Sequence, residues 1–135
     1  MPDTSFPEEG AEIAPMLIVA DLPRSLDFYE RLGAQVLMAW DTYAQLRLGA
    51  GRLHLATPSP SSDDKPGIAL VPPPDRYELS GEGVLHVADC RQVYVSLRAR
   101  GVVFLEPPSN PAWGGETRCF LQDPDGHLIE ISQTD

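Results

Sequence analysis

Five ionisable side chains fall inside apolar, strand-like stretches of this sequence, and they are the first candidates for a functional site. They are Arg52, His54, Glu82, His86 and Glu130. Imidazole and carboxylate groups can bind a divalent ion or move a proton. Because an ionisable group that faces a pocket is costly unless it is paired or used, a shared location for these five would indicate a functional surface.

The alternation of side chains along each stretch predicts that all five share one face. Successive residues of a strand point to opposite sides, so the strongly apolar alternate set is expected to meet a helix. That set is Ile13, Pro15, Leu17, Val19, Leu53, Leu55, Leu85, Val87, Ile129 and Ile131. The intervening residues face a concave surface, and they are Ala14, Met16, Ile18, Arg52, His54, Ala56, Glu82, Val84, His86, Leu128, Glu130 and Ser132.

The elements that position these residues are predicted to occur twice. The sequence LIVADL at 17–22 matches LHVADC at 85–90 at four of six positions. Each copy ends a strand and begins a helix, and a glycine closes each helix, at Gly33 and Gly101. The repeated order of strand, helix, glycine and strand indicates an internal duplication.

Cap and turn residues support these boundaries. Asp21 and Asp89 are expected to cap the N-termini of the two helices. The sequence Asp123-Pro124-Asp125-Gly126 predicts a β-turn, with proline at its second position and glycine at its fourth. Strand-like stretches follow the first helix at 34–40, 43–48 and 52–57, and the second at 102–105, 116–122 and 127–133.

We therefore predict an α+β fold of two tandem βαβββ modules, which form a curved mixed sheet around a cavity with the helices outside. Residues 1–10 are interpreted as a frayed leader and 11–57 as the first module. Residues 58–81, rich in proline and serine, form a linker, and 82–135 form the second module.

The net charge of −10, from 20 acidic and 10 basic side chains, argues against nucleic acid as a partner and favours a cationic small molecule. No stretch approaches the roughly 18 apolar residues that cross a membrane, so no membrane partner is expected. The N-terminus is polar and acidic, so we do not expect it to act as a secretory signal. We expect a cytoplasmic protein in which Cys90 and Cys119 are free thiols.

Two stretches resemble the vicinal oxygen chelate superfamily of glyoxalases, bleomycin-resistance proteins and extradiol dioxygenases. The first is VADL followed by SLDFYERLG, and the second is RCFLQDPDGHLIEIS near the C-terminus. The resemblance covers Glu12 to Gln133 and implies the fold. Because the superfamily includes lyases, epimerases, dioxygenases, thiol transferases and drug-binding proteins, the resemblance leaves the reaction open.

The resemblance also implies a metal site. Metal-binding members take one ligand from the first and last strand of each module, and the matching positions here are Ala14, His54, Glu82 and Glu130. His54 stands where a carboxylate is more usual and Glu82 where histidine is more usual, while Ala14 cannot bind a metal. His54, Glu82 and Glu130 could hold Zn²⁺, Mn²⁺, Fe²⁺ or Ni²⁺. Glu130, or else Glu82, would also act as catalytic base.

Each of these residues also has a purely structural interpretation. Glu130 can pair with Arg52 or His54 instead of a metal. Glu82 can lie in solvent at the entrance of its strand, and His54 can be a hydrogen-bonded lining. His86 either contacts a ligand or is a satisfied core histidine.

Further residues complete the predicted ligand-binding set, which is Arg52, His86, Trp113, Met16, Ile18 and Trp40. Trp113 lies in the loop before the strand at 116–122, where it can stack on a planar ligand or anchor the loop. Trp40 can close the pocket or an interface. His127, directly after the β-turn, is expected to be a surface residue.

Two functional hypotheses follow. One is a metal-dependent lyase or epimerase of the glyoxalase type, in which the ion binds two neighbouring oxygens of the substrate and stabilises an enediolate-like charge. The other is a metal-free protein of the bleomycin-resistance type, which sequesters a cationic aromatic drug with the help of Trp40 and Trp113. In either case we expect a homodimer, with a small-molecule pocket formed within one chain or across two.

Overall fold

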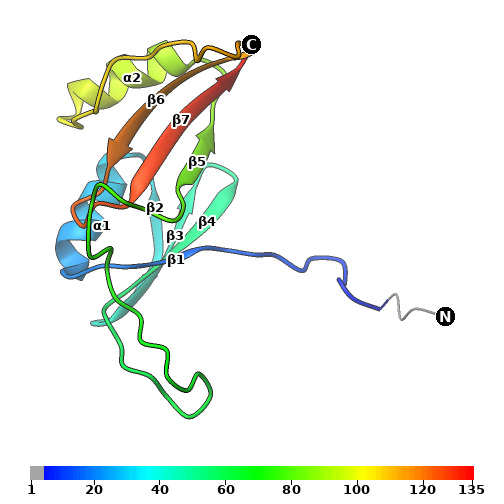
Figure 1. The fold of residues 1–135 in the computed structure, drawn as a ribbon, viewed down its shortest axis with the longest axis vertical. Coiled ribbons are helices and arrows are strands. Elements are labelled where there is room, and N and C mark those ends of the chain that lie inside the picture. Colours follow the sequence, from blue (N-terminus) through cyan, green and yellow to red (C-terminus); the bar gives the residue numbers. More distant parts are fainter. Residues whose placement is uncertain (1–4) are drawn as a thin grey trace.

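The computed structural model describes residues 5–135 and has the predicted α+β fold, in which the strands form two small sheets (Figure 1). Of the leader predicted at 1–10, residues 1–4 lie outside the described residues. Residues 5–15 form neither helix nor strand, and Figure 1 shows them extending away from both sheets. Ile13, in this segment, is 98% exposed.

The first half of the chain contains all the predicted elements. They are β1 (Met16–Ile18), α1 (Leu22–Arg31), β2 (Gln35–Ala39), β3 (Tyr43–Leu48) and β4 (Gly51–Ala56). The strands form one sheet in the order β1-β4-β3-β2, in which β1 runs parallel to β4. The alternation from Ile13 to Val19 predicted a longer first strand, but β1 begins only at Met16, because Pro15 has no backbone N–H to continue a ladder.

The second half repeats this order with one strand fewer. Its elements are β5 (Gly83–His86), α2 (Cys90–Ala99), β6 (Glu116–Gln122) and β7 (Leu128–Thr134), with strand order β5-β7-β6. The prediction of a strand at 102–105 is wrong, since this segment meets β6 only through an isolated bridge from Phe104 to Leu121. Pro107 and Pro108 follow closely and lack backbone donors, so a continuous ladder cannot extend along this edge.

The helix boundaries follow the predicted caps. The carboxylates of Asp21 and Asp89 each accept a hydrogen bond from the backbone N–H three residues further on, at 3.1 and 3.0 Å. Gly33 and Gly101, just beyond the helices, have φ angles of 106° and 87°, where a side chain would be strained. Cap and glycine therefore fix both ends of each helix.

A hydrophobic core draws on both halves. Its buried members include Val19, Leu22, Tyr29, Leu46, Leu55, Cys90, Leu97, Leu121 and Ile131. Leu55 in β4 and Ile131 in β7 are completely inaccessible, at 0% exposure. Burial of one side chain of this size contributes about 1.5–3 kcal/mol. Because α1, α2 and both sheets share this core, each half stabilises the other.

The predicted turn Asp123–Gly126 also connects the two halves. The hydroxyl of Tyr29, in α1, donates to the buried carboxylate of Asp123 at 2.7 Å. Burial and the nearby charge of Asp123 raise the pKa of the Tyr29 phenol, so it remains a donor. Asp125 accepts from the backbone N–H of Ala20 at 2.9 Å. The turn of the second half thus holds the start of the first helix.

His127 belongs to the same connection, which corrects the prediction that it is a surface residue. It is half-buried, and its Nε2 lies 2.8 Å from the carbonyl oxygen of Ile18, to which it donates. The short β1 strand is therefore anchored by the beginning of β7. Within residues 5–135, no helix is long and apolar enough to cross a membrane.

Candidate functional site

The residues predicted for the site lie on two separate sheets. The first sheet carries Met16, Ile18, Arg52 and His54, with Trp40 just after β2. The second carries His86 and Glu130, with Glu82 just before β5 and Trp113 in the loop before β6. Their strand neighbours Leu55 and Ile131 lie in the core, so His54 and Glu130 are on the sheet faces that point away from it.

On the first sheet, His54 takes part in a chain of hydrogen bonds. The amide of Gln45 donates to the Tyr43 oxygen at 2.9 Å, and the Tyr43 hydroxyl lies 2.6 Å from Nδ1 of His54. The Tyr43 oxygen is therefore held by hydrogen bonds on two sides, to Gln45 and to His54. The ring of Trp40 lies 6.0 Å from that of Tyr43 and is 68% exposed.

The other predicted residues of the first sheet have separate surroundings. Met16 is the ladder partner of His54 and is 44% exposed. Ile18 is buried, so the surface of a single chain does not present it to a ligand. Arg52 pairs with Glu12 at 3.8 Å on the exposed edge of the molecule.

On the second sheet, Arg118 joins two carboxylates. Its Nη1 lies 3.6 Å from Oε1 of Glu116 and 3.8 Å from Oε1 of Glu130. Glu116 and Arg118 are alternate residues of β6 and share a face, while Glu130 reaches that face from β7. Because the Glu130 side chain is only 9% exposed, it requires a partner of opposite charge.

Two aromatic rings complete the surroundings of the Arg118 guanidinium. Its central carbon lies 4.8 Å from the ring centroid of Trp113 and 5.0 Å from that of Phe120. Both distances are within the range of about 6 Å for a cation–π interaction. Two backbone hydrogen bonds between Ser109 and Arg118, each of 3.0 Å, close the loop that carries Trp113. The loop therefore holds the indole beside the guanidinium.

Glu82 adds a third carboxylate, and we call Glu82, Glu116, Arg118 and Glu130 the carboxylate–arginine cluster. Desolvation, a hydrogen bond with Glu130 and the charge of Glu130 raise the pKa of Glu82, whereas Arg118 lowers it. Glu82 therefore keeps its proton to a higher pH than an isolated glutamate does. His86 lies on the same face, two strands away from Arg118, and is exposed.

The predicted metal ligands do not come together within one chain. In the part of the chain that the structure describes, no group of three or more His, Cys, Asp or Glu side chains is placed to hold a metal ion. His54 is bonded to Tyr43 on the first sheet, and Glu130 already has Arg118 as its cation. The donors of a single chain therefore do not fit a divalent ion, and no catalytic step through one follows from them.

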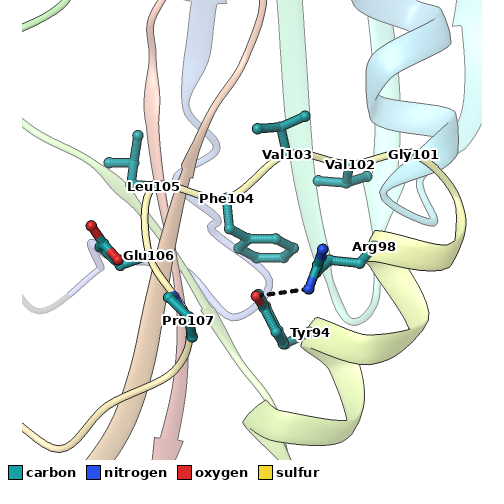
Figure 2. A pocket seen from close by; sticks show the side chains of 9 residues that line it. All are labelled: Tyr94, Arg98, Gly101, Val102, Val103, Phe104, Leu105, Glu106 and Pro107. Carbon is teal, nitrogen blue, oxygen red and sulfur yellow. Dashed lines mark hydrogen bonds between the residues drawn. The ribbon is translucent and has the colours of Figure 1, made fainter.

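Two hollows open on the surface away from these residues. One, of about 390 Å³, is lined by α2 and the segment after it (Figure 2). Its polar side chains pair with each other, since Arg98 donates to the Tyr94 hydroxyl at 3.3 Å and lies over the Tyr94 ring. The other, also of about 390 Å³, lies between α1 and the turn at 123–126. Neither is lined by a predicted site residue, so the sheet faces remain the better candidate.

The two cysteines offer no nucleophile. Cys90 and Cys119 are free, as expected from the sequence, and both are buried, with their sulfur atoms 3.7 Å apart. Burial raises the pKa of Cys119 to about 12 and also raises that of Cys90. Both thiols therefore stay protonated near neutral pH and unreactive.

Arg118, Glu116 and Phe120 are absent from the predicted set although they surround Glu130. The signal for them is the alternation along β6, whose other residues, Thr117, Cys119 and Leu121, are buried. The same alternation that selected His54 and Glu130 therefore places Glu116, Arg118 and Phe120 on the open face.

Two sequence comparisons bear on this chain. Residues 13–131 match the family model described as the Glyoxalase/Bleomycin resistance protein/Dioxygenase superfamily. The glyoxalase domain-containing protein RDO1 of Mycosarcoma maydis is 30% identical over 116 residues, or 83% of this chain. The chain spans 61% of the length of that relative.

Several solved structures share the fold. A bleomycin-binding protein complexed with bleomycin has a TM-score of 0.69 and 22% identity, and the match covers 93% of this chain and 99% of that one. A bleomycin resistance determinant encoded on the transposon Tn5 has a TM-score of 0.69 and 23% identity, with 93% and 98% covered. A glyoxalase/bleomycin resistance protein/dioxygenase from Nocardioides has a TM-score of 0.67 and 23% identity, with 92% and 83% covered. At these identities the likeness establishes the fold.

Proposed function

We propose that this chain, which belongs to the Glyoxalase/Bleomycin resistance protein/Dioxygenase superfamily, is a small-molecule-binding protein that needs no metal and whose ligand carries a planar cationic group. The observation that supports this most is the environment of Arg118. Carboxylates and aromatic rings surround one planar cation there, and Trp113 beside it remains 71% exposed. Such surroundings suit a flat cation in general.

The charge of the whole protein supports the same ligand class. A net charge of −10 attracts cations over the distance of a Debye length and raises their association rate. The bleomycin-binding protein of similar fold was solved with bleomycin bound. We therefore choose bleomycin as the first probe for this chain.

We further propose that the protein acts as a homodimer, in which the open face of one sheet meets the open face of the other sheet from the partner. Met16 and Val84 occupy equivalent places in the two ladders, and each is 44% exposed in a single chain. Apolar side chains at such positions favour a covering surface. Sedimentation equilibrium should give twice the chain mass of 14.8 kDa, and a mass equal to one chain would contradict the dimer.

Calorimetric titration with metal-free bleomycin tests the binding function. We expect saturable binding to the wild type and about tenfold weaker binding to Trp113→Ala, because an aromatic partner of the ligand is lost. Val95→Ala, at an exposed position on α2, is the control and should bind like the wild type. Absence of binding to the wild type by bleomycin and by simpler aromatic cations would refute the proposal.

The metal-dependent lyase of the same superfamily is the alternative, and it needs a partner chain to bring His54 to Glu82 and Glu130. Titration with Zn²⁺, Mn²⁺, Fe²⁺ and Ni²⁺ under anaerobic conditions distinguishes the two. Stoichiometric binding that Glu130→Gln abolishes and Ala14→His tightens would overturn the metal-free function. We expect neither heat nor a thermal shift with the wild type.

A further inference from the structure

We infer that Arg118 is an internal occupant of the ligand site: in the free protein its guanidinium fills the place of the ligand's planar cation, and the ligand must displace it. The identity of that ligand rests on the proposed function. The contacts of the cluster alone support two points. Arg118 occupies this place in the free protein, and another planar cation can replace it there. The inference therefore predicts a guanidinium or amidinium group on the ligand.

Arg118 is attracted by its carboxylate partners but makes no short hydrogen bond to them. Its Nη1 lies 3.6 Å from Glu116 and 3.8 Å from Glu130. Charge-assisted hydrogen bonds between such groups are typically about 2.7–2.9 Å long. The carboxylates therefore attract this cation without a short hydrogen bond to it, and a free cation can approach them more closely.

The location of Arg118 allows its side chain to leave while its backbone stays in place. The backbone is fixed by hydrogen bonds to Ser109 and by the ladder to β7. The side chain is 28% exposed, and the indole of Trp113 beside it is 71% exposed. Displacement therefore requires a rotamer change toward solvent and no break in the sheet.

The cluster also explains why the displacing group must be cationic. Without the guanidinium, Glu82, Glu116 and Glu130 would face each other with no positive charge among them. Glu130 is too buried for water to compensate this repulsion well. The site therefore holds a cation in both states, which is Arg118 before binding and the ligand after it.

The flat shape of the expected group follows from the two rings. A guanidinium or amidinium can stack on Trp113 and still direct its N–H groups at carboxylates in its own plane. An ammonium has no face to stack and is more strongly hydrated. The same site should therefore prefer a guanidinium to an ammonium of equal charge.

Titration of Arg118→Ala with guanidinium ion, observed by NMR and by Trp fluorescence, tests the inference. We expect saturable binding at millimolar concentrations that is about tenfold tighter than to the wild type, and weaker binding of methylammonium. Arg31→Ala is the matched control, because Arg31 is also ion-paired, to Asp27 at 3.2 Å, but lies on α1, away from the cluster. It should gain no binding.

Arg118→Gln, which retains most of the side chain, provides a second variant should Arg118→Ala unfold, as checked by circular dichroism. If neither variant binds guanidinium better than Arg31→Ala does, the inference is overturned, whatever bleomycin does. If guanidinium binds as expected but bleomycin binds no form of the protein, the inference stands and the proposed drug-binding function fails. When both ligands bind, bleomycin should bind Arg118→Ala more tightly than the wild type.

Discussion

The two halves of the chain place different chemistry at equivalent positions of the same scaffold. The ladder neighbours of His54 are Met16 and Gln45, and those of Glu130 are Val84 and Phe120. Tyr43 and Arg118 then occupy the same diagonal place beside His54 and Glu130. One half carries a tyrosine–histidine pair there, and the other carries an arginine–glutamate pair.

The two pairs differ in how firmly they are held. Tyr43 and His54 form a hydrogen bond of 2.6 Å, which fixes both groups. Arg118 and Glu130 are 3.8 Å apart, so they attract each other by charge without a short bond. A tryptophan lies beside each pair, Trp40 in the first half and Trp113 in the second. The two halves therefore share the frame of the open face and differ in its chemistry, since the second half holds a cation at the place where the first half holds a tyrosine.

The largest expected effect would test whether the two halves are equal as structural units. Leu55 and Ile131 are equivalent residues of β4 and β7, and both are completely buried. Leu55→Ala and Ile131→Ala should each lower the free energy of unfolding by about 2–5 kcal/mol, since each leaves a cavity in the shared core. Urea unfolding should show one transition for both variants. A separate early transition in either would mean that the halves unfold independently.

A smaller effect is expected from the tyrosine hydroxyl groups of the two helices, which bond to unlike partners. Tyr29→Phe removes the hydroxyl that donates to buried Asp123 and should lower the free energy of unfolding by about 1–3 kcal/mol. Tyr94→Phe in the other helix removes a hydroxyl whose partner, Arg98, is exposed, and should change the unfolding free energy by about 0.5 kcal/mol or less. Urea unfolding of both variants measures the difference, and equal costs would refute the role of the Asp123 bond.

The smallest expected effect is a dependence of the unfolding free energy on pH. It arises in the second half of the chain, which carries the carboxylate–arginine cluster. The pKa of Glu82 in the folded protein lies above its ordinary value of 4.5, so the folded state binds its proton more tightly than the unfolded state does. The stability that this proton contributes is fully present below that value and is lost as the pH rises through the raised pKa. Glu82→Gln should flatten this part of the profile. Parallel profiles for the variant and the wild type, from urea unfolding across this range, would contradict the raised pKa of Glu82.

Local signals in the sequence predicted most of the fold. Aspartate caps, terminal glycines and the turn at 123–126 depend on interactions within a few residues, so they can be predicted from the local sequence. The strand predicted at 102–105 was wrong, because its apolar residues favour a strand whereas Pro107 and Pro108 prevent a ladder at this edge. At this segment the local propensity favours a strand but tertiary pairing is prevented, so no strand forms.

The candidate site was less predictable, because it depends on which strands become neighbours. Alternation alone puts Glu130 on the open face, but the partner of Glu130 is set by the register between β6 and β7. That register brings Arg118 to Glu130, where the family pattern had suggested a metal. The division of His54 from Glu82 and Glu130 likewise follows from the two sheets being separate, which no single stretch of sequence encodes.

The turn at 123–126 has a consequence for the evolution of a duplicated chain. Asp125 accepts from the backbone N–H of Ala20, and its other oxygen lies 3.4 Å from the hydroxyl of Ser25. The corresponding hairpin of the first half is only Gly49-Ala50, which has no side chain that could return such bonds. These side-chain bonds are therefore one-sided: the turn of the second copy supports the first helix, and the hairpin of the first copy makes no equivalent bond. Loss of the second copy, or its replacement by a duplicate of the first, would leave the first helix without these bonds, so the two copies are no longer interchangeable.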